Sequence, residues 1–147
     1  MNSQTTEDRD RLVAAAREAC RSAHAPYSGI QVGVAIRSVA GATYTGTNVE
    51  NAAYPLGNCA EASAIAAGVR AEGEPFRIAE TAVWAFDREG RAIAISPCGG
   101  CRQRIHEFAE NERVSIHFPW KNGEVRTASV NELLPYAFEL PASRKGC

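Results

Sequence analysis

The stretch IQVGVAIRSVAGATYTGTNVE, residues 30–50, decides the fold. Its first nine residues alternate as a half-buried strand does, VAGA supplies a turn, and TYTGTNVE has the composition of an antiparallel partner. A hairpin is therefore predicted in the first third of the chain. Before it, residues 7–23 carry apolar side chains at helical spacing until Pro26 and Gly29 interrupt the pattern. A helix is predicted to precede the hairpin.

Helical and extended patterns continue to alternate beyond the hairpin. CAEASAIAAGVRAEG is rich in helix-forming residues and predicts a second helix, and a third is expected to begin at SPCGGC, with Ser96 as its N-cap and Pro97 in the first helical position. The predicted strands are IAETAVWAF, AIAIS, RVSIHF and VRTA, and the capped final helix is SVNELL. This order predicts one α/β sandwich domain, residues 1–147, with residues 1–6 and 141–147 as flexible tails.

Charge and hydropathy exclude several classes of protein. The net charge is -1, and basic and acidic residues are interspersed, so no basic stripe is available to follow a phosphate backbone. No apolar run approaches the roughly 20 residues of a membrane span, and the N-terminus is polar and acidic. The sequence predicts a cytoplasmic protein that binds a small molecule and neither nucleic acid nor a membrane.

The five cysteines do not indicate a disulfide framework, because their number is odd and the predicted compartment is reducing. Cys20 lies on the apolar side of the first predicted helix, where a small buried hydrophobe is expected. Cys59, Cys98 and Cys101 instead stand at predicted helix starts, where the helix dipole favours the thiolate that binds a metal.

Three thiolates leave one tetrahedral position of a zinc ion open, whereas a structural zinc site is normally closed by a fourth Cys or His. His24, His106 and His117 have no ligand spacing to the cysteines. Glu61 follows Cys59 by two residues, so its carboxylate can lie beside the metal without binding it. The pattern predicts one zinc ion per chain, with water in the open position and Glu61 as the group that transfers protons.

CAE at 59–61 and PCGGC at 97–101 match the motif of the zinc-dependent base deaminases. The stretches APYSGIQVGVAI, GTNVENAAYPLGNCAE, SPCGGCRQ and NELLPYAF resemble the small cytidine deaminases, in the same order, from about Arg11 to Phe138. The resemblance implies a three-layer sandwich with a mixed five-stranded sheet flanked by helices. It also implies a homotetramer with shared active sites that hydrolyses cytidine and deoxycytidine to the uridines and ammonia, a reaction of pyrimidine salvage.

The resemblance also assigns substrate contacts. Asn48 and Glu50 resemble the pair that binds the ribose hydroxyls, and the main-chain groups of Ala60 and Ser96 would bind the pyrimidine edge. Phe138 resembles the aromatic residue that a neighbouring subunit places over the base. The alternatives from the residues alone are an ordinary strand end for Asn48 and Glu50, and core packing of a C-terminal helix for Phe138.

Two positions depart from the family pattern. Ala62 stands where an arginine commonly donates hydrogen bonds to the zinc thiolates, so the backbone at the helix starts and Arg102 are expected to replace it. Ile30 stands where a phenylalanine usually lies against the nucleoside, which keeps an apolar wall without the ring. A modified cytosine nucleoside, or an aminopyrimidine such as blasticidin S, is therefore the alternative substrate.

Two other classes of function use part of the same pattern. One is a non-catalytic interaction domain stabilised by zinc, and the other is a thiol redox protein using the CGGC motif. The redox interpretation needs only Cys98 and Cys101 and leaves Cys59, Glu61 and NVEN unexplained. A metal analysis separates it from the two zinc proteins.

Overall fold

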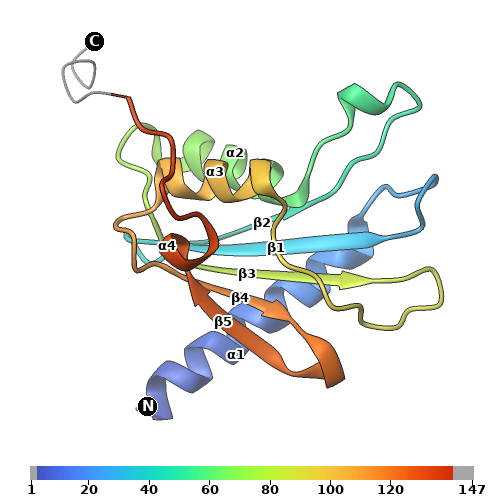
Figure 1. Cartoon of the computed structure of the whole chain (residues 1–147), viewed down its shortest axis with the longest axis horizontal. Helices are drawn as coiled ribbons and strands as arrows, with labels where there is room; N and C mark the ends of the chain where they lie inside the picture. Colours follow the sequence, from blue (N-terminus) through green and yellow to red (C-terminus); the bar gives the residue numbers. More distant parts are fainter. Residues whose placement is uncertain (1–2, 141–147) are drawn as a thin grey trace.

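The computed structural model describes residues 3–140 as three layers, with one sheet between two layers of helices (Figure 1). The strands are β1 Gln31–Ser38, β2 Thr43–Thr47, β3 Ile78–Phe86, β4 Ser115–Pro119 and β5 Val125–Ser129. The helices are α1 Ser3–Ala19, α2 Ala60–Glu72, α3 Gly99–Phe108 and α4 Val130–Leu133, with short 3-10 turns η1 Cys20–Ser22, η2 Tyr54–Leu56 and η3 Lys121–Gly123. The predicted α/β sandwich is confirmed.

The sheet is mixed and has the strand order β2-β1-β3-β4-β5. β1 is antiparallel to β2 and to β3, β4 is parallel to β3, and β5 is antiparallel to β4. The predicted hairpin is the β1–β2 pair, in which Gly33 lies opposite Thr47. Because β3 and β4 are parallel, the chain must cross between them, and the crossover carries α3.

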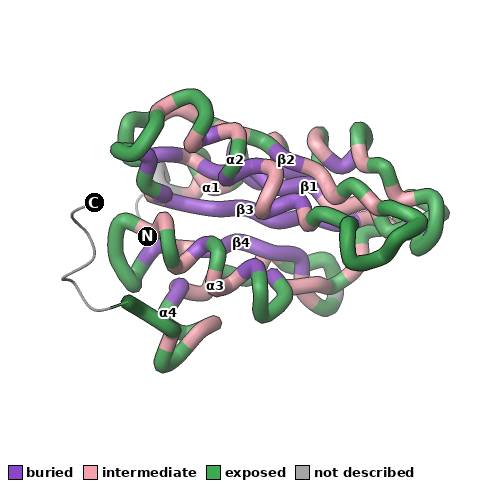
Figure 2. The backbone as a smooth tube through the Cα atoms, turned by 90° about the horizontal axis from the view of Figure 1, so that it is seen from above, coloured by how far each residue is buried: buried purple, intermediate pink, exposed green. Residues whose placement is uncertain are grey.

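Alternating side chains of the sheet build one apolar core on each face. Val34 and Ile36 pack with α2 and α3, whereas Ala35 of the same strand faces α1 together with Ala82 and Trp84. Figure 2 shows the central strands β1, β3 and β4 as largely buried and the loops at their ends as exposed. Strands covered on both faces explain the nearly continuous apolar run of β3.

A polar cluster interrupts the α1 side of the sheet. His117 lies opposite Ala82 in the β3–β4 pair, so its side chain is on the same face as Ala82. Its Nε2 is 2.7 Å from Oε1 of the buried Glu80, and its Nδ1 is 2.8 Å from the hydroxyl of Thr127. Arg37 donates to the other carboxylate oxygen of Glu80. The side chains of His117 and Glu80 are therefore hydrogen-bonded within this cluster, as burial requires.

Three details differ from the predictions. Residues 3–6, expected in a tail, belong to α1, while the remaining tail residues lie outside the described part. Residues 92–96 form no strand: Ile93 donates to the carbonyl of Ala85, but Ile95 donates to that of Pro119. This segment therefore passes from the end of β3 to the end of β4 instead of extending either ladder.

The third difference concerns the start of α3. The N-cap is Cys98 and not Ser96, because the hydroxyl of Ser96 accepts from Arg102 and the backbone of Cys98 is still extended. The predicted capping of the final helix is confirmed, since Ser129 and Glu132 form a capping box at α4.

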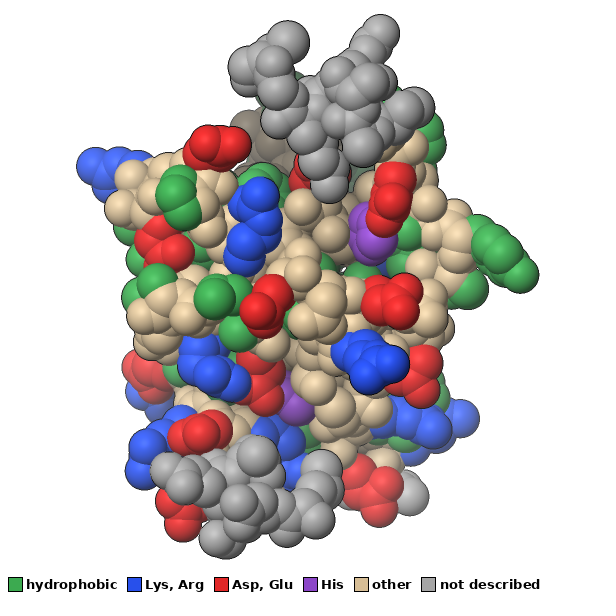
Figure 3. All heavy atoms as spheres, turned by 90° about the vertical axis from the view of Figure 1, so that its left-hand side faces the viewer, with side chains coloured by type: hydrophobic (Ala, Val, Ile, Leu, Met, Phe, Trp, Pro, Cys, Tyr) green, Lys and Arg blue, Asp and Glu red, His purple; other side chains and the backbone are tan. Residues whose placement is uncertain are grey.

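The surface carries charges of both signs. On the face shown in Figure 3, Lys and Arg side chains alternate with Asp and Glu side chains. This agrees with the net charge of -1 and with the expectation that no basic stripe is present on that face. Within residues 3–140, the structure contains no helix that meets the length and hydropathy needed to cross a bilayer.

Candidate active site

Three cysteine sulfurs converge where α2 and α3 begin. Cys59 is the N-cap of α2, Cys98 is the N-cap of α3, and Cys101 lies in the first turn of α3. Their sulfur atoms all lie within 4.8 Å of one another. Tetrahedral zinc with Zn–S bonds of about 2.3 Å requires sulfurs about 3.8 Å apart, so the three residues can reach one ion with small adjustments. The predicted ligands are thus brought together.

The surroundings shift the pKa values of the three thiols in different directions. Burial raises the pKa of the Cys101 thiol far above its usual range, and the Glu61 carboxylate beside it adds to the rise. Burial also raises the pKa of Cys59. Partial burial opposes ionisation of Cys98 too, but hydrogen bonds from the N–H groups of Cys101 and Gly100 outweigh it and lower its pKa. Three adjacent thiolates therefore need a cation to neutralise them, and zinc prefers this donor set.

Glu61 lies in the first turn of α2 and is only 5% exposed. Its position depends on how closely α2 approaches β2. A Cβ on Gly46 of β2 would lie 2.3 Å from the amide nitrogen of Ala64 and 2.5 Å from the carbonyl oxygen of Ala60. Only glycine permits this approach, and the first turn of α2 that it brings close to β2 carries Glu61 and follows directly on Cys59.

The arginine beside the sulfurs is not the one expected. Arg102 donates to the carbonyls of Pro97 and Leu133 and to the hydroxyl of Ser96, so it joins α4 to the loop before α3. The Nη1 atom of Arg104 lies 3.9 Å from the sulfur of Cys101. Arg104 is therefore the arginine that contacts a predicted metal ligand.

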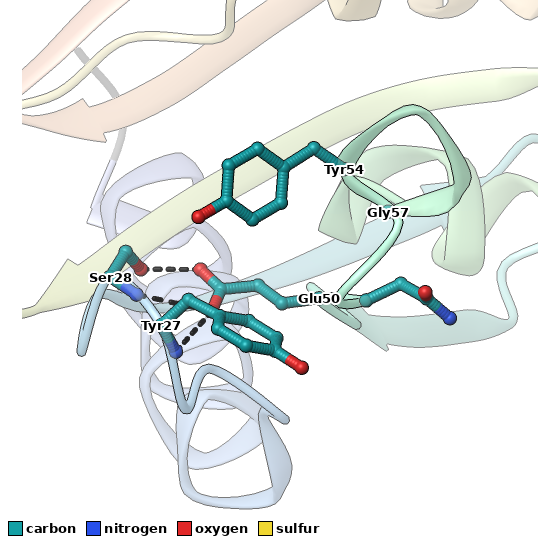
Figure 4. Close-up of a pocket in the computed structure, with 6 residues that line it drawn as sticks. Tyr27, Ser28, Glu50, Tyr54 and Gly57 are labelled. Carbon is teal, nitrogen blue, oxygen red and sulfur yellow. Dashed lines mark hydrogen bonds between the residues drawn. The ribbon is translucent and has the colours of Figure 1, made fainter.

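A cavity of about 350 Å³ has Gly57, two residues before Cys59, in its wall. It is lined by Tyr27, Ser28, Glu50, Asn51, Tyr54 and Gly57. Figure 4 shows the rings of Tyr27 and Tyr54 on either side of the Glu50 carboxylate, and their centroids are 6.1 Å apart. Gly57 precedes Cys59 by two residues, so at most about 7 Å of chain separates the cavity wall from the first predicted metal ligand.

The structure places the two predicted ribose contacts differently. Glu50 lines the cavity, where its carboxylate accepts from the N–H groups of Tyr27 and Ser28 and from the Ser28 hydroxyl. The hydroxyl bond, with the backbone bonds, lowers the pKa of Glu50. The side-chain amide of Asn48 donates to the carbonyl of Ile30, and its oxygen accepts from Val32 at 2.8 Å. Asn48 thus holds the start of β1.

The other predicted contacts are spread over the fold: two are at the starts of α2 and α3, Ile30 precedes β1 and Phe138 follows α4. Ala60 is buried at the start of α2, Ser96 precedes α3, and the side chain of Ile30 is 39% exposed. Phe138 is 70% exposed. The side-chain amide of Gln103 pairs with both backbone groups of Phe138 and so fixes this segment. The ring of Phe138 faces solvent. Against the residues that the structure describes, Phe138 makes no core packing, which was the alternative for it.

Sequence reasoning missed six residues of the site. Five of them line the cavity, namely Tyr27, Ser28, Asn51, Tyr54 and Gly57, and the sixth, Arg104, contacts Cys101. Tyr27 and Tyr54 fall inside the quoted stretches APYSGIQVGVAI and GTNVENAAYPLGNCAE, where two polar aromatics flanking a carboxylate motif could have indicated a binding site. Nothing in the local pattern distinguishes Arg104 from Arg102.

Comparisons with known proteins give one consistent result. A family model described as the cytidine and deoxycytidylate deaminase zinc-binding region matches residues 6–117. The cytidine deaminase of Sporosarcina psychrophila is 36% identical over 131 residues, which are 89% of this chain and 91% of that protein. The crystal structure of cytidine deaminase from Burkholderia pseudomallei matches with a TM-score of 0.76 at 36% identity, covering 88% of this chain and 98% of that one. The cytidine deaminase from Mycobacterium tuberculosis matches with a TM-score of 0.72 at 33% identity, covering 90% and 98%.

Proposed function

The chain belongs to the cytidine and deoxycytidylate deaminase family, and we propose that it hydrolyses cytidine and deoxycytidine to uridine and deoxyuridine with release of ammonia. The observation that carries the proposal is the convergence of three cysteine sulfurs beside a buried carboxylate, together with a cavity that is lined by a second carboxylate and reaches Gly57, two residues before Cys59. A redox dithiol would need neither Cys59 nor Glu61 at the same point.

Cys59, Cys98 and Cys101 would hold the zinc ion, and the set has no fourth protein ligand among the residues that the structure describes. When bound through three protein ligands, zinc supplies the Lewis acidity that makes a water molecule ionise near neutral pH. The protein's part is to fix the three sulfurs on two helix starts and to keep the fourth side accessible.

Glu61 moves the protons. Deamination adds water at C4 of the pyrimidine and expels ammonia, so one group must carry one proton of the water to N3 and then the other proton, from the hydroxyl on C4, to the departing nitrogen. Glu61 is suited to both transfers because its carboxylate is shielded from solvent and rigidly held by α2 beside the sulfurs. Every proton released by water is then accounted for in the product or in ammonia.

The cavity would hold the nucleoside sugar. Glu50 is an ionised acceptor for a ribose hydroxyl, and the hydrogen bonds from Ser28 and Tyr27 fix its carboxylate in one orientation. Asn48 uses one of its two amide hydrogens on Ile30, which leaves the other for a sugar hydroxyl. The side chain of Ile30 would form an apolar wall in place of a ring.

The base would lie between the two helix starts. The main-chain groups of Ala60 and Ser96 would then bind the pyrimidine edge. Phe138 would cover the base of a neighbouring copy in a homotetramer, and support for this comes from its exposed ring on a backbone that Gln103 holds in place. Light scattering on the purified chain tests the assembly.

The test of the function is the release of ammonia from a panel of substrates by protein that carries one zinc per chain. Cytidine and deoxycytidine are expected to react, with modified cytidines and blasticidin S as comparators. The control is the protein after zinc removal by a chelator, which should be inactive and should recover on adding zinc. Turnover of the comparators without turnover of cytidine would contradict the proposed substrate.

A further inference from the structure

The proposed metal centre carries an excess of negative charge. Three thiolates around a divalent ion leave a net charge of -1, and the Glu61 carboxylate beside Cys101 adds a second negative charge. Excess negative charge weakens the attraction of the ion for a further ligand unless nearby donors offset it. The residue that follows Glu61 is Ala62, which has no charge to offer.

A guanidinium group lies where this charge is concentrated. The Nη1 atom of Arg104 is 3.9 Å from the sulfur of Cys101, one turn earlier on α3. A Cβ on Gly100 would lie 3.4 Å from the same nitrogen, so the side chain folds back along the helix toward its N-terminus. Arg104 makes no ion pair with any carboxylate in residues 3–140, which leaves its charge directed at the sulfur.

The neighbouring arginine is committed elsewhere. Arg102 donates through Nε, Nη1 and Nη2 to Pro97, Leu133 and Ser96, and these bonds hold α4 and the loop before α3. A change at Arg102 would therefore disturb the fold around the site. Arg104 is exposed and has no such structural bonds among the described residues, so its charge can be removed with little effect on folding.

We propose that Arg104 is a positioning residue of the metal centre, whose positive charge offsets the thiolate charge and strengthens zinc binding through Cys101. It acts on the ligand and touches neither the substrate nor the reacting atoms. The proposal rests on the zinc site of the proposed function, and it adds a residue outside the cysteine motif.

The expected effect is modest. Removal of an outer partner of a metal ligand typically costs 10- to 100-fold in affinity or activity. The exposure of Arg104 allows water and salt to screen its charge, which places the expectation at the lower end, about 10-fold in zinc affinity. The exposure of Arg104 also allows a test with salt. The difference in zinc affinity between the unmodified protein and a variant that is neutral at position 104 should shrink as the ionic strength rises to about 1 M.

The test measures zinc affinity by competition with a chromophoric chelator, using full-length protein at fixed pH. Arg104→Met removes both the charge and the donor, Arg104→Gln keeps an N–H donor, and Arg104→Lys keeps the charge. Arg113→Gln is the matched control, because Arg113 is exposed and its side chain makes no hydrogen bond or ion pair in the described part of the chain. Circular dichroism confirms that each variant is folded.

The proposal expects about 10-fold weaker binding for the Met and Gln variants, a smaller loss for Lys, and no change for Arg113→Gln. It is overturned if the Met variant binds zinc as tightly as the unmodified protein, if the Gln variant does so, or if Lys is as weak as Met. Unmodified protein that bound no zinc would instead contradict the proposed function. One zinc per chain with equal affinities in all variants would remove only the role of Arg104.

Discussion

Gly46→Ala changes a residue of β2, but it should damage the active site by displacing α2. The new Cβ would lie 2.3 Å from the amide nitrogen of Ala64, which must withdraw by about 1 Å to reach an ordinary contact at 3.4 Å. The clash is with backbone atoms of α2, so no side-chain rotation relieves it. The first turn of α2 has to move, and it carries both Cys59 and Glu61.

The magnitude follows from that displacement. A misplacement of about 1 Å at a reacting group can cost on the order of 100-fold in rate. Overpacking of this kind also destabilises a protein by about 1–3 kcal/mol. We therefore expect kcat/KM for cytidine to fall on the order of 100-fold in protein that remains folded at assay temperature.

A matched control separates misplacement of the site from a general loss of stability. Gly68 lies on the same helix, and a Cβ there would lie 2.2 Å from Cε2 of Phe76, away from the sulfurs. Gly68→Ala should lower the free energy of unfolding by a similar amount and leave kcat/KM within about 3-fold, because the first turn of α2 is not displaced. Zinc content, urea unfolding and initial rates are measured for both variants. Equal activities for the two variants would refute the reasoning.

Three further predictions concern single side chains. Cys59→Ala should bind less than one zinc per chain and lose activity, whereas Cys20→Ala should keep its zinc; full occupancy in the Cys59 variant would show that another group is the ligand. Glu80→Gln should lower the free energy of unfolding by about 2 kcal/mol at pH 7. Hydrogen bonds from His117 and Arg37 lower the pKa of Glu80 in the folded protein below its usual value of 4.5. This stabilisation is therefore present above pH 4.5 and is lost as the pH falls through the pKa of Glu80 in the folded protein. Parallel pH profiles of urea unfolding for Glu80→Gln and the unmodified protein would contradict this expectation. Phe138→Ala should raise KM. After subunit exchange with inactive Glu61→Gln, some sites should show the KM of the unmodified protein if the ring comes from a neighbouring copy; a KM that stays raised would count against a shared site.

Short-range patterns, together with the deaminase motif, predicted the three cysteines that the structure brings together. Cys98 and Cys101 are three residues apart at a helix start, so the spacing itself sets their sulfurs on one turn. Cys59 also caps a helix, and the resemblance to a known family supplied its pairing with the other two. Sequence reasoning succeeded there because helix starts are short-range features with strong composition signals.

Contacts between distant segments could not be predicted in this way. Arg102 and Arg104 are two residues apart on α3, and which of them reaches a sulfur depends on the Leu133 carbonyl that captures Arg102 from another element. Residues 92–96 have strand composition, but their N–H groups bond to the ends of two different strands. His117 is buried with partners from the two neighbouring strands, Glu80 on β3 and Thr127 on β5.

The most direct test of the account is the rate of ammonia release from cytidine by Glu61→Gln with its zinc content measured on the same sample. The amide is nearly isosteric with the carboxylate and cannot accept a proton, so the variant should keep one zinc per chain and lose about 100- to 10,000-fold in kcat. Unmodified protein that releases ammonia together with a zinc-loaded but nearly inactive variant is the predicted result. Turnover within a few fold of the unmodified protein, at full zinc occupancy, would contradict the assignment of Glu61 as the proton carrier.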